Sequence, residues 1–421
     1  MFTSLLFFSC TQTPQNESSA SLNDLTREVA ELKELILEQS AQIQSLEEES
    51  SLMLTEYNTL LNGYNELNEQ YHTLNENVST LNQENSTPVM IKEDTTWNIN
   101  PNGDGDYASL NEALSALREM VLIPGVELVI QLSSGTYIFD QSIDLTHSNG
   151  RQITIQGNEE DPLATVLQFS QSNGFTSNGL GVSLIKNMHI MGSDVESGVM
   201  LYNNAVLNAE NLSVSHFKIG LQIDTQAKML LSGNNGIELC ETGIYVHTNG
   251  QLISYDFLSS TNNTSHGMSI NINGTVYANT MDMNNNQVHG FVVANNSTAN
   301  VTTLNAQGNG AFGVFTDVGG SLTINNAQIH NNNYQGLYIS RGSAIKAEYA
   351  SITGNGMTGA AITTGSFANF NGAEISDNVG GVGVSYGSTV TVFDAVLQNN
   401  QGPNGLGVDL NVDESSFSVG Q

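Results

Sequence analysis

The sequence predicts an all-β solenoid of parallel coils preceded by a long α-helical coiled coil, and three periodic patterns carry this prediction. The first is a column of asparagines at intervals of 23 residues, with a last interval of 22: Asn263, Asn286, Asn309, Asn332, Asn355, Asn378 and Asn400. The second is a column of glycines, each followed by alternating apolar residues, at intervals of 22 to 24: Gly198, Gly220, Gly243, Gly267, Gly290, Gly313, Gly336, Gly359, Gly381 and Gly405. The third is a heptad pattern between residues 22 and 81. A period of about two dozen residues indicates a solenoid with one coil per repeat.

The coil at residues 336–358 illustrates the predicted repeat. We expect three short strands, at residues 337–340, 344–347 and 350–353, joined by Gly/Ser or Asn/Gly turns. Parallel coils stack about 4.8 Å apart. An inward asparagine at a tight turn tolerates the αL conformation, and its amide can bond the equivalent amides above and below. The asparagine column is therefore expected to form a stacked ladder.

The heptad pattern begins after a polar segment. Of eighteen positions reached by alternate steps of three and four from Leu22 to Leu81, sixteen are apolar or aromatic. So narrow an apolar seam predicts an oligomeric coiled coil over residues 22–86, with a single solvated helix as the alternative. Branched residues at a and Leu at d favour two strands. Tyr57, Tyr64 and Tyr71 at a need more room, so a trimer is equally compatible.

The segment before this helix reads MFTSLLFFSC, with an apolar run that ends just before Cys10. It resembles the end of a bacterial lipoprotein signal, in which the cysteine is lipidated and becomes the mature N-terminus. We therefore expect a signal at residues 1–10, lipidation of Cys10, a tether at 11–21, and a protein that is secreted or anchored at the outer surface of a cell envelope. A cleaved signal without lipid and an apolar start of no consequence remain as alternatives.

Composition excludes other classes of partner. The 421 residues include 42 acidic and 10 basic side chains, a formal charge of −32. Nucleic acids and anionic membrane surfaces need Lys/Arg patches, so neither is expected as a partner, and membrane association is expected through the lipid alone. An acidic surface suits an extracellular or saline setting because net charge maintains solubility.

A cap is expected between the helix and the repeats. We predict a linker at residues 87–97, a cap and first coils at 98–180, and repeats of about 23 residues at 181–421. The cap comprises a helix at residues 107–120, with Leu110, Ala113, Leu114 and Leu117 on one face, and strands at 127–132, 136–139 and 152–155.

The coil pattern, the asparagine column and the cap motifs GDGDYASLNEAL, GTYIF and RQITIQG (starting at Gly103, Gly135 and Arg151) resemble the right-handed parallel β-helix of the pectate-lyase-like superfamily. The resemblance includes its repeat-only and phage-tailspike members and covers the chain from residue 98. It implies a right-handed solenoid whose first coil is plugged by an amphipathic helix. It is specific for fold and not for activity, since one fold hosts many functions.

Lyases of this superfamily typically place Ca²⁺-binding carboxylates beside a basic residue that abstracts a proton alpha to a uronate. Arg341 and Lys346 form a close basic pair here, with Glu348 beside them, and Lys346 and Glu348 are expected to point outward from one strand. They are weak catalytic candidates. Two solvated charges on a strand face are the alternative, and no catalytic residue is assigned.

Outward positions two and four residues after each repeat glycine form another candidate surface. Tyr245, Phe315 and Tyr338 should share one column, with Asp224, His247 and Asp317 beside it: aromatic faces with acids and amides suit sugar stacking and hydroxyl bonding. Scattered surface aromatics are the alternative.

No metal site or cofactor is predicted, although Ca²⁺ remains possible. The segment NPNGDGD at residues 100–106 is similar to the first half of a calcium loop, but position twelve is Asn111 rather than Glu, which favours a tight turn. The histidines His189, His216, His247, His266, His289 and His330 show no metal-ligand spacing, and Cys240 is expected as a buried apolar filler.

Three functions fit these expectations. The first is a surface protein that binds or adheres to a polysaccharide or cell-surface glycan without catalysis. The second is a polysaccharide lyase or glycosidase with a site on the solenoid face. The third is a tailspike-like structural fibre, in which the coiled coil assembles the chains and Cys10 has no role.

Overall fold

The computed structural model describes residues 22–83, 89–400, 409–412 and 417–419. The expectations for Cys10, for residues 1–21 and for Gly405 lie outside these residues. The chain divides between residues 87 and 88 into a helical and a β-rich unit. Neither helix in the described parts has an apolar stretch long enough to cross a membrane.

The helical unit contains α1 (Leu22–Gln83). The predicted seam residues whose side chains the structure describes are exposed in the single chain, for example Ile36 at 60%, Leu60 at 75% and Leu67 at 66%. A single helix that leaves these apolar side chains in water gains no stability from burying them. The coiled coil therefore remains a prediction for the assembled protein.

The β-rich unit begins earlier than the sequence predicts. Part of the expected linker is strand: β1 (Val89–Ile91) pairs with β3 (Met120–Leu122), and β2 (Thr95–Ile99) pairs with β4 (Leu128–Leu132). Trp97 and Ile99 alternate with exposed residues and point into the core, which draws this segment into the first coil.

The cap helix is shorter than expected, because α2 spans Leu110–Leu117 rather than residues 107–120. Ser109 sets its start, since its Oγ accepts a hydrogen bond from the Glu112 N–H at 3.1 Å. The chain then turns into β3, which ends the helix. All four predicted core residues of the helix are buried, so it closes the first coil as expected.

The first coils continue through elements that stack in parallel: β5 (Gly135–Phe139), β6 (Ile143–Asp144), η1 (Gly150–Gln152), β7 (Ile153–Gln156), η2 (Pro162–Ala164), β8 (Thr165–Phe169) and β9 (Phe175–Ile223). The long β9 rounds several corners at single αL residues such as Asn187 and Asn211. It pairs in parallel with β7 and β8 before it and with β10, β11 and β12 after it.

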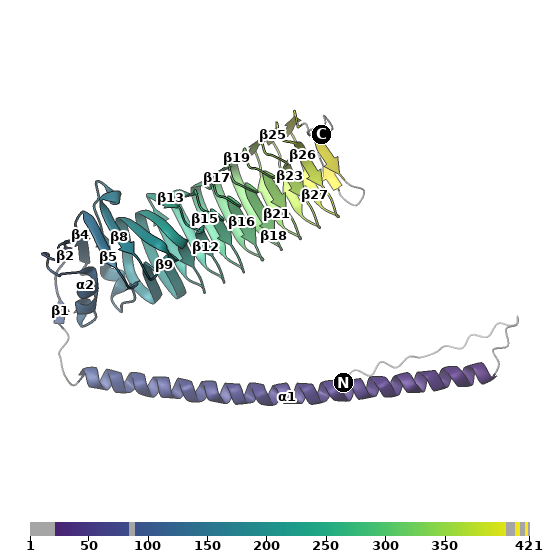
Figure 1. The fold of residues 1–421 in the computed structure, drawn as a ribbon, viewed down its shortest axis with the longest axis horizontal. Coiled ribbons are helices and arrows are strands. Elements are labelled where there is room, and N and C mark those ends of the chain that lie inside the picture. Colours follow the sequence, from purple (N-terminus) through teal and green to yellow (C-terminus); the bar gives the residue numbers. More distant parts are fainter. Residues whose placement is uncertain (1–21, 84–88, 401–408, 413–416, 420–421) are drawn as a thin grey trace. The chain divides into compact units, whose positions relative to one another are not determined.

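From β10 to β27 every strand pairs with its counterpart one coil later, and the coils form a row of three parallel sheets (Figure 1). The first sheet consists of β12 (Thr242–Val246), β14 (Met268–Ile270), β16 (Phe291–Ala294), β18 (Val314–Asp317), β20 (Leu337–Ile339), β23 (Thr358–Ile362), β26 (Gly380–Val384) and β29 (Leu410–Val412). The second contains β10 (Lys228–Ser232), β21 (Ala344–Ala347), β24 (Phe367–Asn369), β27 (Thr389–Thr391) and β30 (Phe417–Val419). The third contains β11 (Asn234–Glu238), β22 (Ser351–Thr353), β25 (Glu374–Ser376) and β28 (Val396–Gln398). Four longer strands serve both the second and the third sheet: β13 (Gln251–Thr261), β15 (Thr275–Asp282), β17 (Thr298–Gln307) and β19 (Ser321–His330).

The asparagine ladder is confirmed. Asn286, Asn309 and Asn332 are at most 1% exposed, and each Nδ2 donates to the Oδ1 of the next amide, at 3.2, 2.8 and 3.0 Å. Each Oδ1 also accepts the backbone N–H of the preceding ladder residue. Cys240 occupies the ladder position one coil before Asn263, and its backbone N–H donates a hydrogen bond to Asn263 Oδ1 at 3.0 Å. It is buried, as expected.

The ladder asparagines do not use the αL conformation that an asparagine tolerates. The residue before each one has positive φ instead: Asn262, Asn285, Gly308, Asn331, Gly354, Asp377 and Asn399. The bend at that residue leaves the next amide free to point inward. The glycine column makes room for the same amides, since a Cβ at Gly290 would lie 2.7 Å from Asn309 Nδ2.

Candidate functional site

The outward column of the first sheet runs in the predicted register. Backbone pairing places Tyr245 next to Ser269, Ser269 next to Val292, Val292 next to Phe315, and Phe315 next to Tyr338. The three predicted aromatic residues therefore share one column. Ser269 and Val292 separate Tyr245 from the other two, so the column holds two groups rather than one continuous surface.

The first group surrounds Tyr245. Its ring stacks on His247 with centroids 5.1 Å apart. His247 Nδ1 lies 3.5 Å from Asp224 Oδ1. Burial opposes ionisation of Asp224, but hydrogen bonds from Thr248 and Thr225 hold its pKa below the ordinary value. Asp224 is therefore an ionised, already partnered carboxylate rather than a proton donor.

The second group contains Phe315, Tyr338 and Asp317. The two rings are 5.6 Å apart. Asp317 is 4% exposed and accepts hydrogen bonds from Ser340 Oγ at 2.6 Å and from Arg341 Nε at 2.6 Å. Burial raises the pKa of Asp317, but the bonds from Arg341 and Ser340 outweigh it and lower the pKa below its ordinary value. Arg341, a candidate catalytic base, is thus held in a two-point ion pair with Asp317.

A further set of rings extends this group, and the sequence reasoning missed it. His266, His289 and Phe312 each stand one residue before a repeat glycine, and their rings stack at 5.0 and 4.7 Å with interplanar angles of 4° and 7°. Phe312 then stacks on Tyr338 at 5.0 Å and 16°. We call these four residues the aromatic stack. Its signal was the interval of 23 residues between His266, His289 and Phe312.

Burial keeps the histidines of the stack neutral. It lowers the pKa of His266, and it lowers the pKa of His289 to about 4, with His266 adding to the shift. His289 Nδ1 accepts the backbone N–H of Phe312 at 3.2 Å, so its other ring nitrogen carries the proton. A neutral, nearly parallel stack behaves as one extended aromatic surface.

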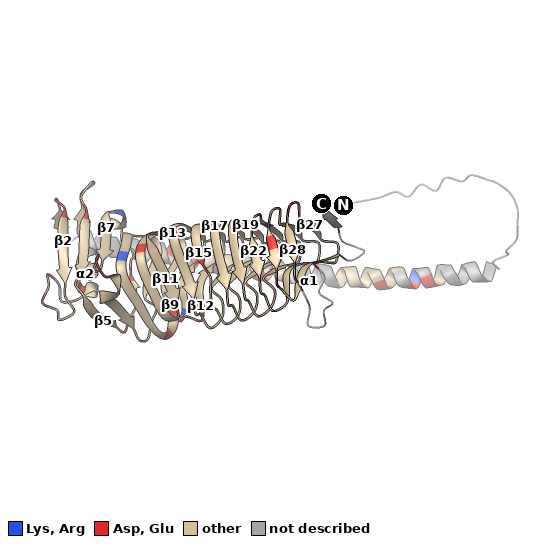
Figure 2. Ribbon diagram, turned by 90° about the horizontal axis from the view of Figure 1, so that it is seen from above, with Lys and Arg blue, Asp and Glu red and all other residues tan. Residues whose placement is uncertain are grey.

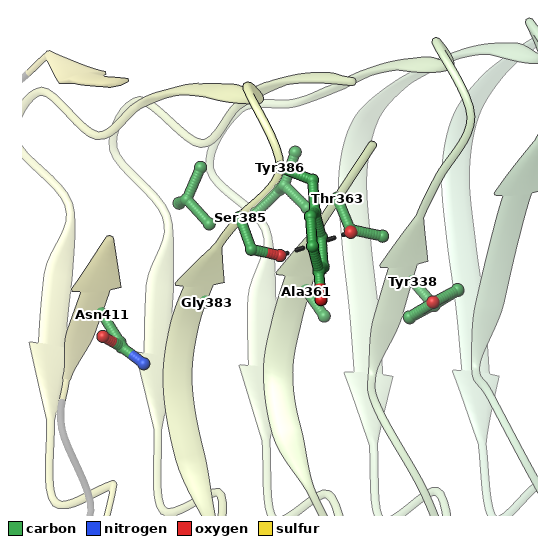
Figure 3. Close-up of a pocket in the computed structure, with 9 residues that line it drawn as sticks. Tyr338, Ala361, Thr363, Gly383, Ser385, Tyr386 and Asn411 are labelled. Atoms are coloured by element: carbon green, nitrogen blue, oxygen red, sulfur yellow. Dashed lines mark hydrogen bonds between the residues drawn. The ribbon is translucent and has the colours of Figure 1, made fainter. Parts of the chain in front are cut away.

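A hollow of about 320 Å³ lies at the end of this stack (Figure 3). Ala361 and Gly383 succeed Tyr338 in the outward column and form its floor, and Asn411 follows them. Phe312 covers one face of the Tyr338 ring, whereas the small Ala361 on the other side leaves the second face bordering the hollow.

The rim of the hollow is polar. Ser385 Oγ donates to Thr363 Oγ1 at 3.3 Å, and both hydroxyls border the space. Tyr386, 73% exposed, stands on the turn that follows β26 with φ of 53°. The remaining described lining residues are Ile362 and Val384. One aromatic face, hydroxyl groups and an amide thus converge on one space, a typical lining for a small polar ligand.

Comparison with known proteins agrees with this architecture. A family model described as "Right handed beta helix region" matches residues 289–419. The β-rich unit has the fold that this model describes, a right-handed β-helix. A search of curated proteins found no match.

Two solved structures resemble the β-helix. The A-module of the mannuronan C-5 epimerase AlgE6 from Azotobacter vinelandii superposes with a TM-score of 0.52 and 14% identity, over 69% of this chain and 90% of that one. The Agl-KA catalytic domain gives a TM-score of 0.36 and 13% identity, over 73% of this chain and 64% of that one. At such identities the first likeness shows a shared fold, and the second is too low to support an inference.

The remaining catalytic candidates lie on another sheet of the β-helix. Lys346, on β21, forms an ion pair with Glu348 at 3.2 Å, and Glu348 Oε1 accepts a hydrogen bond from Asn369 Nδ2 at 3.0 Å. Arg341, the other member of the predicted basic pair, is bound to Asp317 instead. The three candidates therefore belong to two separate ion pairs.

Asp104 and Asp106 of the segment that resembles a calcium loop are already bonded to asparagines. Asp104 Oδ1 accepts from Asn100 Nδ2 at 2.8 Å, and Asp106 Oδ2 accepts from the backbone N–H and the Nδ2 of Asn98 at 2.6 and 3.2 Å. Across the described ranges no three His, Cys, Asp or Glu side chains converge to hold a metal ion.

Proposed function

We propose that this β-helix protein binds a polysaccharide on its first sheet and does not cleave it. The observation that carries the proposal is the second face of Tyr338, which borders a hollow rimmed by hydroxyl and amide groups. The flat apolar side of a pyranose packs well on an aromatic face, while its hydroxyls need hydrogen-bonding partners at the edges. Thr363 and Ser385 supply those partners beside Tyr338, and Asn411, three coils from Tyr338, borders the far end of the hollow.

The stack behind Tyr338 supports this role by holding the ring in place. Phe312 lies against its other face and Phe315 packs at 44° beside it, so few orientations remain open to the ring. A ring that is already fixed loses little conformational entropy when a ligand binds, and affinity gains accordingly.

The absence of cleavage is proposed because the two carboxylates beside the outward column already have partners. Asp317 is bound to Arg341 and Ser340, and Asp224 to His247 and two threonines. Transfer of a proton to or from a sugar needs a group free to change its charge within hydrogen-bond reach. These two carboxylates are held in the ionised form by their partners.

The N-terminal segments fit a display role. We propose that residues 22–86 assemble two or three chains and that Cys10 carries a lipid that anchors the protein at the outer surface of a cell envelope. Linked binding sites gain avidity for a repetitive polymer without any new contact. Sedimentation of the full chain should report a dimer or trimer. Palmitate labelling should be lost in Cys10→Ser.

Retention on a panel of immobilised polysaccharides tests the binding proposal. Tyr338→Ala should weaken retention at least tenfold, equivalent to about 1.4 kcal/mol. Tyr277→Ala is the matched control, because Tyr277 lies on β15, away from the first sheet, and is 45% exposed. Equal binding by the wild type and Tyr338→Ala would contradict the site. Release of reducing ends or of unsaturated products from a retained polymer would contradict the absence of cleavage.

A further inference from the structure

We propose that the bound polymer is uncharged and that the hollow beside Tyr338 receives one of its sugar rings. This inference rests on the proposed function and names the class of ligand. It is drawn from the charge and the size of the hollow.

The lining of the hollow carries no charge among its described residues. It consists of tyrosine, alanine, glycine, aliphatic, hydroxyl and amide side chains. A carboxylate or sulfate on the sugar would lose water there without meeting a cation, and an unpaired charge is costly to desolvate. The hydroxyls of a neutral sugar, in contrast, can bond to Ser385 and Thr363.

The surroundings also disfavour an anionic polymer. Arg341 follows Tyr338 by three residues, but its guanidinium is bound to the buried carboxylate of Asp317, so the pair has no net charge. The whole chain carries a formal charge of −32 and repels anions at long range. Figure 2 shows few charged residues of either sign along the coils between β12 and β27.

The size of the hollow follows from two positions in the outward column. A residue as large as Tyr338 at either Ala361 or Gly383 would fill the space next to its ring. With Ala361 and Gly383 present the hollow measures about 320 Å³, near the lower end of the roughly 300–1,000 Å³ typical of small-molecule sites. It therefore suits a short piece of a polymer rather than a long stretch.

Matched pairs of oligosaccharides test the charge. The neutral members are hexamers of β-1,4-mannose and β-1,4-glucose, and the acidic members are the hexamers of β-1,4-mannuronate and β-1,4-glucuronate. Each acidic sugar differs from its partner at C6 alone. Titration calorimetry of the full chain should detect at least one neutral hexamer, bound at least tenfold more tightly than its acidic partner, with or without added Ca²⁺.

The outcomes separate the two proposals. If an acidic hexamer binds as well as its neutral partner or better, the inference is overturned while the proposed function stands. If none of the four hexamers binds and no panel polysaccharide is retained, the proposed function fails. If a panel polysaccharide is retained and it is uronate-rich or sulfated, the inference fails alone.

A second experiment tests the hollow itself. Ala361→Leu should reduce binding of the neutral ligand at least tenfold, since the larger side chain fills the space beside Tyr338. Ala344→Leu is the control, because Ala344 is equally an outward, half-buried alanine but belongs to β21 of the second sheet. The double variant Thr363→Val/Ser385→Ala keeps the shape of the hollow and removes its hydroxyls, and it should also weaken binding. Wild-type affinity in both Ala361→Leu and the double variant would overturn the proposal.

Discussion

Removal of one ladder amide is the perturbation whose size the structure defines best. In Asn332→Ala four hydrogen bonds disappear: Oδ1 no longer accepts from Asn309 N and Nδ2 (3.0 and 2.8 Å), and Nδ2 no longer donates to Ala306 O and Asn355 Oδ1 (2.9 and 3.0 Å). A typical hydrogen bond contributes roughly 0.5–1.5 kcal/mol, and a buried group left without a partner costs roughly 1–3 kcal/mol.

Two of the four partners keep another hydrogen bond. Asn309 Nδ2 still donates to Met283 O, and Asn355 Oδ1 still accepts from the backbone N–H of residue 332. The Asn309 N–H loses its acceptor outright, within a site that is fully buried. We therefore expect a loss of roughly 3–5 kcal/mol in the free energy of unfolding.

Urea unfolding of the full chain measures this loss, with amide hydrogen exchange at Asn309 as a local reporter. Asn333→Ala is the control: Asn333 is the next residue, is exposed, and should cost less than about 0.5 kcal/mol. If Asn332→Ala were no less stable than this control, the ladder would not hold the coils in register as we argue.

Three further predictions concern the charged and titratable groups. Because burial lowers the pKa of His289 to about 4, the unfolded chain takes up a proton at this residue before the folded protein does, and the free energy of unfolding falls between pH 6.5 and pH 4. Over that range His289→Phe should lose roughly 1–3 kcal/mol less than the wild type, as measured by unfolding at a series of pH values. Parallel plots of the free energy of unfolding against pH for the two proteins would contradict this. Arg341→Met leaves the Asp317 carboxylate without its cation and should lower the free energy of unfolding at pH 7, a deficit that shrinks when acid protonates the carboxylate. A deficit that stays constant as the pH falls would show that the ion pair is not its source. Lys346→Ala and Glu348→Ala should each change glycan retention less than twofold, and a larger loss in either variant would place them in the binding site.

The parts of the fold that follow the repeat could be predicted from the sequence. The interval of 23 residues puts Asn286, Asn309 and Asn332 one above another, and it puts Phe315 and Tyr338 in one column. Spacing alone is enough there because each coil must repeat the backbone path of the one before it.

The site is less regular, and for that reason the sequence did not reveal it. His266, His289 and Phe312 are different residue types at equivalent positions, so no consensus marks them, although their rings stack. The floor of the hollow is defined by small side chains, which carry no signal of their own. Asn411 pairs with Gly383 across 28 residues rather than 23, so counting by the repeat does not reach it.

The bounds of the cap also depend on tertiary contacts. Spacing of apolar residues predicts a helix to residue 120, yet Met120 belongs to a strand because β1 is available to pair with it. Local pattern could not decide this, since β1 lies in the segment that the sequence suggests is a linker.

A crystal structure of the β-helix with a bound neutral oligosaccharide tests the central claim most directly. We expect a sugar ring packed on the face of Tyr338 that looks toward Ala361, with its hydroxyls bonded to Ser385 or Thr363. A sugar bound elsewhere, for example on the rings of Tyr245 and His247, with the hollow empty, would contradict the account.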